Sequence, residues 1–209
     1  MTEFAHLIGL VLGYLFGNIE TGYIVAKFNK VDILHQGSGN PGTTNALRTM
    51  GAKPAAITLL GDVLKAAIPL LLVRFVIFPG QTDTLLIEMI TALGVSLGHD
   101  FPFWLKFRGG KGVAVLAGIY ICLYPVLIPF GIIVFMIILL ATKYVSVGSI
   151  VLAVGFPIWT IVAMKEDPYY AGMIIIAVVI GGLVVFSHRA NIKRLIAGKE
   201  NKTYLFKKK

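Results

Sequence analysis

Residues 37–48 combine glycines with neutral hydrogen-bond donors and a single cation. The run reads Gly-Ser-Gly-Asn-Pro-Gly-Thr-Thr-Asn and is followed three residues later by Arg48. The three glycines let the backbone turn tightly and point its amides inward, which forms a nest for an anion. A guanidinium suits phosphate because it donates two parallel hydrogen bonds. The segment therefore predicts a phosphate site, and the alternative is a polar turn with a helix cap at Thr44 or Asn45.

A second glycine-rich segment surrounds Lys111 at the start of a later apolar stretch. Gly109, Gly110 and Gly112 flank this lysine, so amides, a helix N-terminus and the ammonium could all face one anion. The alternative is a flexible loop whose lysine reaches toward the membrane surface. Upstream, His99 could accept a proton near neutral pH, or it could orient the loop by hydrogen bonding.

Two further polar segments carry weaker signals. Ser146 and Ser149 precede an apolar stretch, a place where serines usually cap helices. His188, Asn191 and Arg194 fall on one face of a predicted helix near the C-terminus. Attraction to lipid headgroups would explain a basic segment there, but it would not require an asparagine.

The elements that must position these groups are apolar. The 209 residues are 57% hydrophobic and 14% charged, whereas soluble domains are about 45–50% apolar and about 25% charged. This composition excludes intrinsic disorder, a disulfide scaffold and a water-soluble nucleic-acid binder. A membrane-spanning helix needs about 20 apolar residues, so the chain predicts one helical bundle with little left over. The apolar stretches are 4–28, 54–78, 84–98, 113–123, 126–142, 150–164 and 169–187.

The cations indicate an orientation for this bundle. A break at Pro125 separates the fourth stretch from the fifth, because proline lacks an amide hydrogen. Seven spans with the N-terminus outside then place 16 of the 19 Lys and Arg residues on the cytoplasmic side. Without that break, the basic tail would lie outside. We therefore expect an all-α polytopic bundle of about seven spans with a cytoplasmic C-terminus.

Charged residues within the apolar stretches need partners, because a lone charge is costly in hydrocarbon. Asp62 and Lys65 are three residues apart, so we expect a structural ion pair. Glu20 could orient a loop cation, and Glu88 also needs a partner.

The polar segments together resemble the motifs of a bacterial membrane family, the acyl-phosphate:glycerol-3-phosphate acyltransferases. The matching residues are Gly37, Ser38, Gly39, Asn40, Thr44, Asn45 and Arg48; Gly98, His99, Phe101, Pro102, Phe107, Gly109, Gly110, Lys111 and Gly112; Tyr144, Val145, Ser146 and Ser149; and His188, Arg189, Asn191, Ile192, Arg194, Leu195, Gly198 and Glu200. The likeness covers essentially residues 1–209 as a single domain. Members often have threonine at Val115 and glycine at Ala66, and these two departures affect only local packing.

The resemblance implies transfer of a fatty acyl group from acyl-phosphate to the 1-hydroxyl of glycerol 3-phosphate. The products would be lysophosphatidic acid and inorganic phosphate, with no covalent acyl-enzyme, metal or cofactor. The implied catalytic residues are Ser38, Asn40, Arg48, His99 and Lys111. The implied substrate-binding residues are Gly37, Gly39, Thr44, Asn45, Gly109, Gly110, Gly112, Ser149, His188, Asn191 and Arg194.

The resemblance also implies a setting. The enzyme would lie in the bacterial inner membrane with its active site at the cytoplasmic face, among membrane lipids. A soluble enzyme that makes acyl-phosphate is an implied partner, and nucleic acid is not.

Several alternatives stay open at this point. No histidine is followed by aspartate five positions later, so no sequence-adjacent base and orienter is evident. We therefore favour a substrate phosphate over His99 as the proton acceptor. A small anion transporter is a competing function, although no internal repeat is visible and the motifs lie at one membrane face. A scaffold that recruits soluble proteins through its basic loops would not require the glycines.

Overall fold

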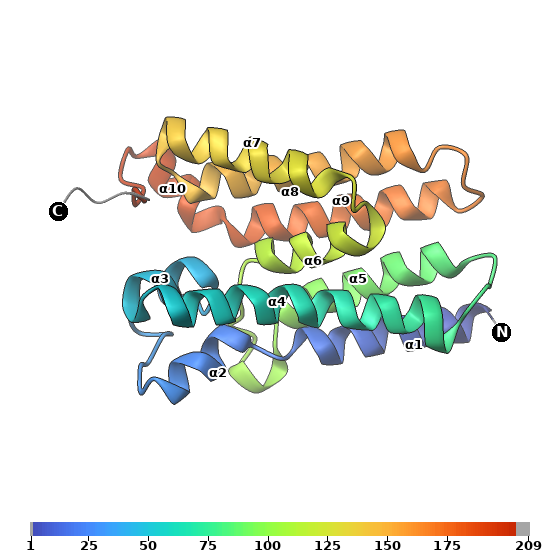
Figure 1. Ribbon diagram of the computed structural model, residues 1–209, viewed down its shortest axis with the longest axis horizontal. Coiled ribbons are helices and arrows are strands. Elements are labelled where there is room, and N and C mark those ends of the chain that lie inside the picture. Colours follow the sequence, from blue (N-terminus) through green and yellow to red (C-terminus); the bar gives the residue numbers. More distant parts are fainter. Residues whose placement is uncertain (1, 204–209) are drawn as a thin grey trace.

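The computed structural model describes residues 2–203, and over that part of the chain it contains helices and no strands (Figure 1). The helices are α1 (Thr2–Gly17), α2 (Thr21–Phe28), α3 (Thr43–Met50), α4 (Ala52–Leu72), α5 (Thr84–Asp100), α6 (Val113–Leu123), α7 (Leu127–Thr142), α8 (Val145–Ala163), α9 (Tyr170–Ser187) and α10 (Arg189–Ile196), with a π-helical turn η1 (Val73–Ile77) and a 3-10 turn η2 (Phe103–Leu105). The predicted all-α class is confirmed. Three of the predicted cytoplasmic cations, Lys207, Lys208 and Lys209, lie outside the described residues.

Within residues 2–203, five segments are long and apolar enough to cross a membrane. They are Glu3–Phe28, Ala52–Ile77, Thr84–Leu105, Val145–Ala163 and Tyr170–Ser187. Helices α6 and α7 are apolar but shorter, and the turn between them contains the proline that was predicted to separate them. Seven crossings and an outer N-terminus stay predictions.

The first apolar stretch is divided into two helices, which its composition does not reveal. The break falls at residues 18–20, where side chains form hydrogen bonds with backbone groups in place of the helix's own bonds. Asn18 accepts a hydrogen bond from the amide of Phe103 at 3.1 Å, and Lys65 donates to the carbonyl of Ile19 at 2.8 Å. A second difference is that α8 begins at Val145, so the two serines lie within its first turns instead of in a preceding loop.

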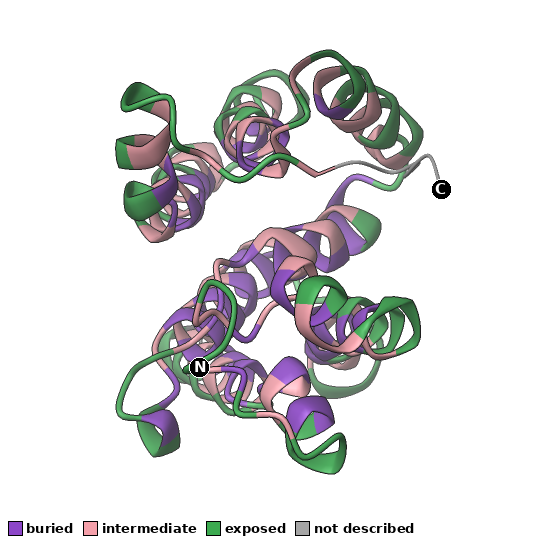
Figure 2. Ribbon diagram, turned by 90° about the vertical axis from the view of Figure 1, so that its left-hand side faces the viewer, coloured by how far each residue is buried: buried purple, intermediate pink, exposed green. Residues whose placement is uncertain are grey.

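The helices form two layers with α6 between them (Figure 1). Helix α1 packs along α5, α4 along α6, and α8 along α9. Helix α3, the start of α8 and α10 lie at one end of the molecule, which we call the motif end; α1 begins at the opposite end. Buried residues line the facing sides of the helices, whereas much of the outer surface is exposed (Figure 2). Many exposed side chains are large and apolar, such as Phe75, Phe130 and Ile132, as expected for contact with lipid.

Small residues let α1 and α5 approach closely. A Cβ on Gly13 would lie 2.1 Å from the carbonyl oxygen of Thr91, and a Cβ on Gly94 would lie 2.3 Å from that of Leu10. Membrane helices commonly use such glycines, because close backbone contact replaces the hydrophobic driving force available in water.

Glu88 has the partner that its position in an apolar helix requires. Arg74 donates two hydrogen bonds of 2.5 Å to its carboxylate and a third, of 3.1 Å, to the carbonyl of Cys122. This pair ties η1, α5 and α6 together far from the motifs.

Candidate active site

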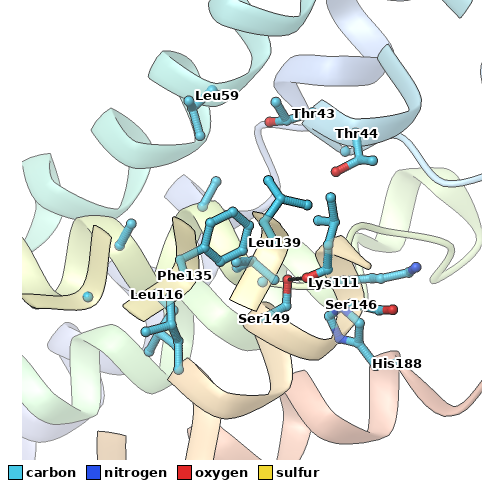
Figure 3. Close-up of a pocket in the computed structure, with 18 of the residues that line it drawn as sticks. Thr43, Thr44, Leu59, Lys111, Leu116, Phe135, Leu139, Ser146, Ser149 and His188 are labelled. Atoms are coloured by element: carbon cyan, nitrogen blue, oxygen red, sulfur yellow. Dashed lines mark hydrogen bonds between the residues drawn. The ribbon is translucent and has the colours of Figure 1, made fainter. Parts of the chain in front are cut away.

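A cavity of about 790 Å³ lies between α4, α6, α7 and α8 and reaches the motif end (Figure 3). The predicted site residues that line it are Ser38, Asn40, Thr44, Asn45, Arg48, His99, Lys111, Gly112, Ser149, His188, Asn191 and Arg194. The predicted residues that do not line it are Gly37, Gly39, Gly109 and Gly110. The lining also includes Thr43, Ser146, Glu200 and Thr203, which the sequence did not single out as site residues.

Asn45 holds the first motif in shape. Its side-chain oxygen accepts the amide of Ser38 at 2.8 Å, and its side-chain nitrogen donates to the carbonyls of Ile33 and Gln36. Because its amide group is occupied in this way, Asn45 supports the loop from within, although it also borders the cavity. Helix α3 starts after Gly42, so the alternative of a helix cap at Thr44 or Asn45 is wrong.

Asn40 connects the first motif to the second. Its side-chain nitrogen donates to the carbonyl of Gly109 at 3.3 Å, and its oxygen accepts the amide of Gly42 at 3.0 Å. This contact joins two loops that are far apart in the sequence.

The glycines of the second motif pack against α5. The amides of Gly109 and Gly110 donate to the carbonyls of Asp100 and His99, at 3.2 and 3.0 Å. A Cβ on Gly110 would lie 2.1 Å from Nε2 of His99, so only glycine lets the loop lie flat on the imidazole. These two glycines therefore position Lys111 rather than forming the cavity wall themselves.

Beneath this loop lies a buried cluster of charged side chains. Nδ1 of His99 is 3.0 Å from Oε1 of Glu20 and 2.7 Å from Nζ of Lys65. Lys65 also lies 3.0 Å from Oδ1 of Asp62, so the predicted structural pair is confirmed. Glu20 thus places a carboxylate beside His99, although no histidine in the sequence is followed by aspartate five positions later. Sequence spacing could not show the contact because the break between α1 and α2, which carries Glu20, comes together with α4 and α5 only in the fold.

Lys111 lies where the cavity meets the polar groups of α10. Its Nζ donates to Oδ1 of Asn191 at 2.6 Å. The pKa of Lys111 falls to about 8 because burial disfavours the ammonium and Arg194 and Arg48 repel it, while Glu200 partly offsets them. The ammonium is therefore still the main form at pH 7, by about ten to one, and it is lost about one pH unit higher.

This lowered pKa predicts an alkaline limb in the rate profile. Because only the protonated lysine can neutralise a developing negative charge, kcat/KM should fall about tenfold per pH unit above pH ~8. The measurement is the initial rate from pH 6 to 10 in wild type and in Lys111→Arg, whose guanidinium stays charged. If kcat/KM of the variant begins to fall at the same pH as that of the wild type, a group other than Lys111 titrates.

Glu200 organises the last motif. Its Oε1 accepts hydrogen bonds from Ser146 at 3.0 Å and Asn191 at 2.7 Å, and its Oε2 accepts one from Arg194 at 2.7 Å. Burial opposes ionisation of Glu200, but the hydrogen bonds from Asn191, Arg194 and Ser146 outweigh it and lower the pKa of the carboxyl. One carboxylate thus fixes side chains from α8 and α10 at the cavity.

Replacing this carboxylate should weaken the site without unfolding the bundle. In Glu200→Gln an amide N–H would face Arg194, so we expect kcat/KM for the phosphorylated acceptor to fall by roughly thirtyfold, or about 2 kcal/mol. Glu166→Gln, in an exposed ion pair remote from the cavity, is the matched control. Equal kinetics for the two variants would show that Glu200 does not organise the substrate-binding side chains.

His188 presents a neutral imidazole to the cavity. Its Nδ1 lies 2.7 Å from the carbonyl of Val184 and must donate to it, which leaves Nε2 as an acceptor. Burial and the charge of Lys111 outweigh that hydrogen bond and the charge of Glu200, and the pKa of His188 falls to about 4. It can therefore accept a hydrogen bond but is a weak base at neutral pH.

Two residues with nucleophilic groups lie outside this constellation. Ser96 belongs to a Gly-Val-Ser-Leu-Gly run that matches the pattern of a nucleophile elbow, which is a strand-to-helix turn. Here it lies inside α5, buried, with its hydroxyl donating to the carbonyl of Ala92 at 2.9 Å. Cys122 is buried near the far end of α6. Neither lines the cavity.

The site combines positive charge with helix N-termini. Helices α3, α6 and α8 all begin at residues that line the cavity or adjoin it, and their first amides have no side-chain cap. Arg48, Lys111 and Arg194 add three cations. Beyond them the lining is apolar, with Leu116, Phe135 and Leu139 visible in Figure 3. The fold and site define a helical membrane protein in which cations and helix N-termini meet at one end of an apolar groove, an arrangement suited to phosphate.

Comparisons with known proteins identify the family. A family model described as glycerol-3-phosphate acyltransferase matches residues 7–198. A glycerol-3-phosphate acyltransferase of Clostridioides difficile (strain 630) is 44% identical over 203 residues, which cover 97% of each chain. One of Geotalea daltonii (strain DSM 22248 / JCM 15807 / FRC-32) is 41% identical over 196 residues, covering 93% of this chain and 96% of the relative.

Solved structures agree with this assignment. The crystal structure of PlsY (YgiH), an integral membrane glycerol 3-phosphate acyltransferase, in its glycerol 3-phosphate form matches with a TM-score of 0.83 and 32% identity, over 95% of this chain and 96% of that one. Its lysophosphatidic acid form matches with a TM-score of 0.80, at 32% identity, over 95% of each chain. The chain belongs to the glycerol-3-phosphate acyltransferase family and is an integral membrane acyltransferase of phospholipid synthesis.

Proposed function

We propose that the acyl donor is a fatty acyl-phosphate and that the acceptor is the 1-hydroxyl of glycerol 3-phosphate, giving lysophosphatidic acid and inorganic phosphate. The observation that carries this proposal is the meeting of three cations and three helix N-termini at the mouth of an apolar groove. Donor and acceptor each bring a phosphate, so two anions must lie close together, while the acyl chain needs apolar surroundings.

Direct transfer needs no acyl-enzyme. Acyl-phosphate is a mixed anhydride: the hydroxyl oxygen attacks the carbonyl carbon, the carbon–oxygen bond to phosphate breaks, and phosphate departs. Arg48 and Arg194 would hold the two phosphates, and Lys111 would neutralise charge on the carbonyl oxygen or the leaving phosphate. Ser38 and Asn40 would complete the polar shell around the donor.

The hydroxyl proton would pass to a phosphate of the substrate. His99 is buried, with Glu20 and Lys65 against one ring nitrogen and Gly110 against the other. His188 is a weak base because its pKa is lowered to about 4. Its Nε2 would instead accept a hydrogen bond from glycerol 3-phosphate and orient it.

This assignment predicts a partial effect at His99. In His99→Gln the loop that carries Gly110 and Lys111 loses the imidazole against which it packs. We therefore expect kcat to fall by about tenfold but not to vanish. Turnover is measured beside that of His35→Gln, an exposed control. A loss as complete as in Lys111→Ala, in protein that still folds, would make His99 the proton acceptor.

The same proposal places the chain in the bacterial inner membrane. All 209 residues would form one domain with seven crossings, an outer N-terminus and a cytoplasmic motif end. The cations of the motif end support this orientation, because Lys and Arg are retained on the cytoplasmic side. A soluble enzyme would then supply acyl-phosphate from the cytoplasm.

A donor comparison tests the proposed function. Purified protein in detergent receives glycerol 3-phosphate with acyl-phosphate, acyl-CoA or acyl carrier protein, and both products are quantified. We expect phosphate and lysophosphatidic acid in equal amounts, with acyl-phosphate only. Product from a thioester donor instead would overturn the choice of donor. No reaction, together with uptake of glycerol 3-phosphate into vesicles, would favour a transporter.

A further inference from the structure

The groove extends well beyond the phosphate-binding groups. Along α8 its lining extends from Ser149, which lines the groove together with Lys111, to Trp159. Ten residues of helix separate these two positions, a distance of about 15 Å. The groove is therefore long enough to hold a substantial part of an acyl chain.

Aromatic residues fasten α6 to α8 at the end of the groove that lies away from the motifs. The hydroxyl of Tyr120 donates to the carbonyl of Leu152 at 3.3 Å, and its ring meets that of Phe156 edge-on, with centroids 5.2 Å apart. Immediately after the end of α6, the hydroxyl of Tyr124 donates to Thr160 at 3.1 Å. These contacts limit how far the space between the two helices can extend.

Gly155 lies in the wall of this groove, and helix packing does not require it. A Cβ there would meet a single neighbouring heavy atom, the hydroxyl oxygen of Tyr120, at 4.0 Å. By contrast, a Cβ on Gly181 would lie 2.6 Å from the carbonyl oxygen of Ala153, so that glycine serves close packing. Glycine costs a helix about 1 kcal/mol in water. What the missing side chain of Gly155 leaves is open space in the groove.

We propose that Gly155 is a specificity-determining residue: it keeps the part of the groove that lies away from the motif end open for long acyl chains. This proposal rests on the proposed function. Gly155 is six residues from Ser149, or about 9 Å along the helix. An extended chain advances about 1.2 Å per bond, since three bonds of an extended backbone span about 3.6 Å. A chain therefore reaches Gly155 after about seven bonds and Trp159 after about a dozen. A six-carbon acyl group ends before Gly155, and a sixteen-carbon group passes it.

The test compares two donors in three proteins. Wild type, Gly155→Leu and the control Gly182→Leu are assayed for lysophosphatidic acid formation from hexanoyl-phosphate and from hexadecanoyl-phosphate. Gly182 is exposed, does not line the groove, and its Cβ would meet nothing within 4 Å. In Gly155→Leu we expect kcat/KM for the long donor to fall by about tenfold or more while the short donor stays within about twofold. The control should keep the wild-type ratio of the two donors.

A second variant guards against a local defect at Gly155. Gly131, on the facing wall in α7, also has room, because its Cβ would meet only Leu152, at 3.7 Å. Gly131→Leu should shift the donor ratio in the same direction. An unchanged ratio in both variants, or an equal loss on both donors, would overturn the proposal. Wild-type protein that uses neither donor would instead overturn the proposed function.

Discussion

Lys111→Ala should reduce kcat by about a thousandfold, since removing one preorganised charge or donor at a developing oxyanion costs about 10²–10³. Lys111 is the cation that the glycine loop, Asn191 and the start of α6 hold together at the cavity. Its ammonium is partly desolvated, which makes its interaction with substrate charge stronger than it would be in water. Arginine at this position should retain part of the rate, because the charge remains while the shape changes.

The control for this variant comes from the same loop. Arg108→Ala removes an exposed cation that does not line the cavity, and it should leave kcat within about twofold. Turnover is measured in detergent at pH 7, with thermal unfolding of each protein as the check on folding. Equal losses in the two variants would mean that the loop needs only general positive charge.

Gly110→Ala should also be strongly damaging, although Gly110 is not proposed to touch substrate. The added Cβ would lie 2.1 Å from Nε2 of His99, and a buried imidazole held by Glu20 and Lys65 cannot easily move away. The loop must therefore shift, and a displacement of about 1 Å in a catalytic group can cost about a hundredfold. We expect kcat to fall by about that factor, measured as initial turnover.

Gly182→Ala adds the same methyl group where nothing lies within 4 Å, and it should keep the wild-type rate. Wild-type turnover in Gly110→Ala would show that the contact between the loop and His99 does not position Lys111.

The apolar pattern predicts most of the helices because the length and composition of a membrane helix are set by the bilayer. The fourth stretch coincides with α6, and the proline after it separates two helices as expected. The divided first stretch is different. Hydropathy cannot reveal it, because the break depends on Asn18 and on Lys65 reaching across from α4.

Residue types and spacing predict the chemistry of the site, and the fold decides what each residue does. Lys111 and Asn191 meet at the cavity as their motifs suggest. Gly109 and Gly110 support the loop instead, and this role depends on the imidazole of His99, which α5 places against Gly110. Glu200 matched the last motif, but its role was not predicted, because the chain must fold back onto α8 before its three hydrogen bonds exist.

The central claim is direct transfer between two phosphate-bearing substrates that are bound together. The most direct measurement is rapid-quench phosphate release from acyl-phosphate at enzyme concentrations near that of the donor, with and without glycerol 3-phosphate. Direct transfer predicts no burst of phosphate without the acceptor, and one lysophosphatidic acid per phosphate with it. A burst equal to the enzyme concentration without glycerol 3-phosphate would reveal an acyl-enzyme and contradict the account.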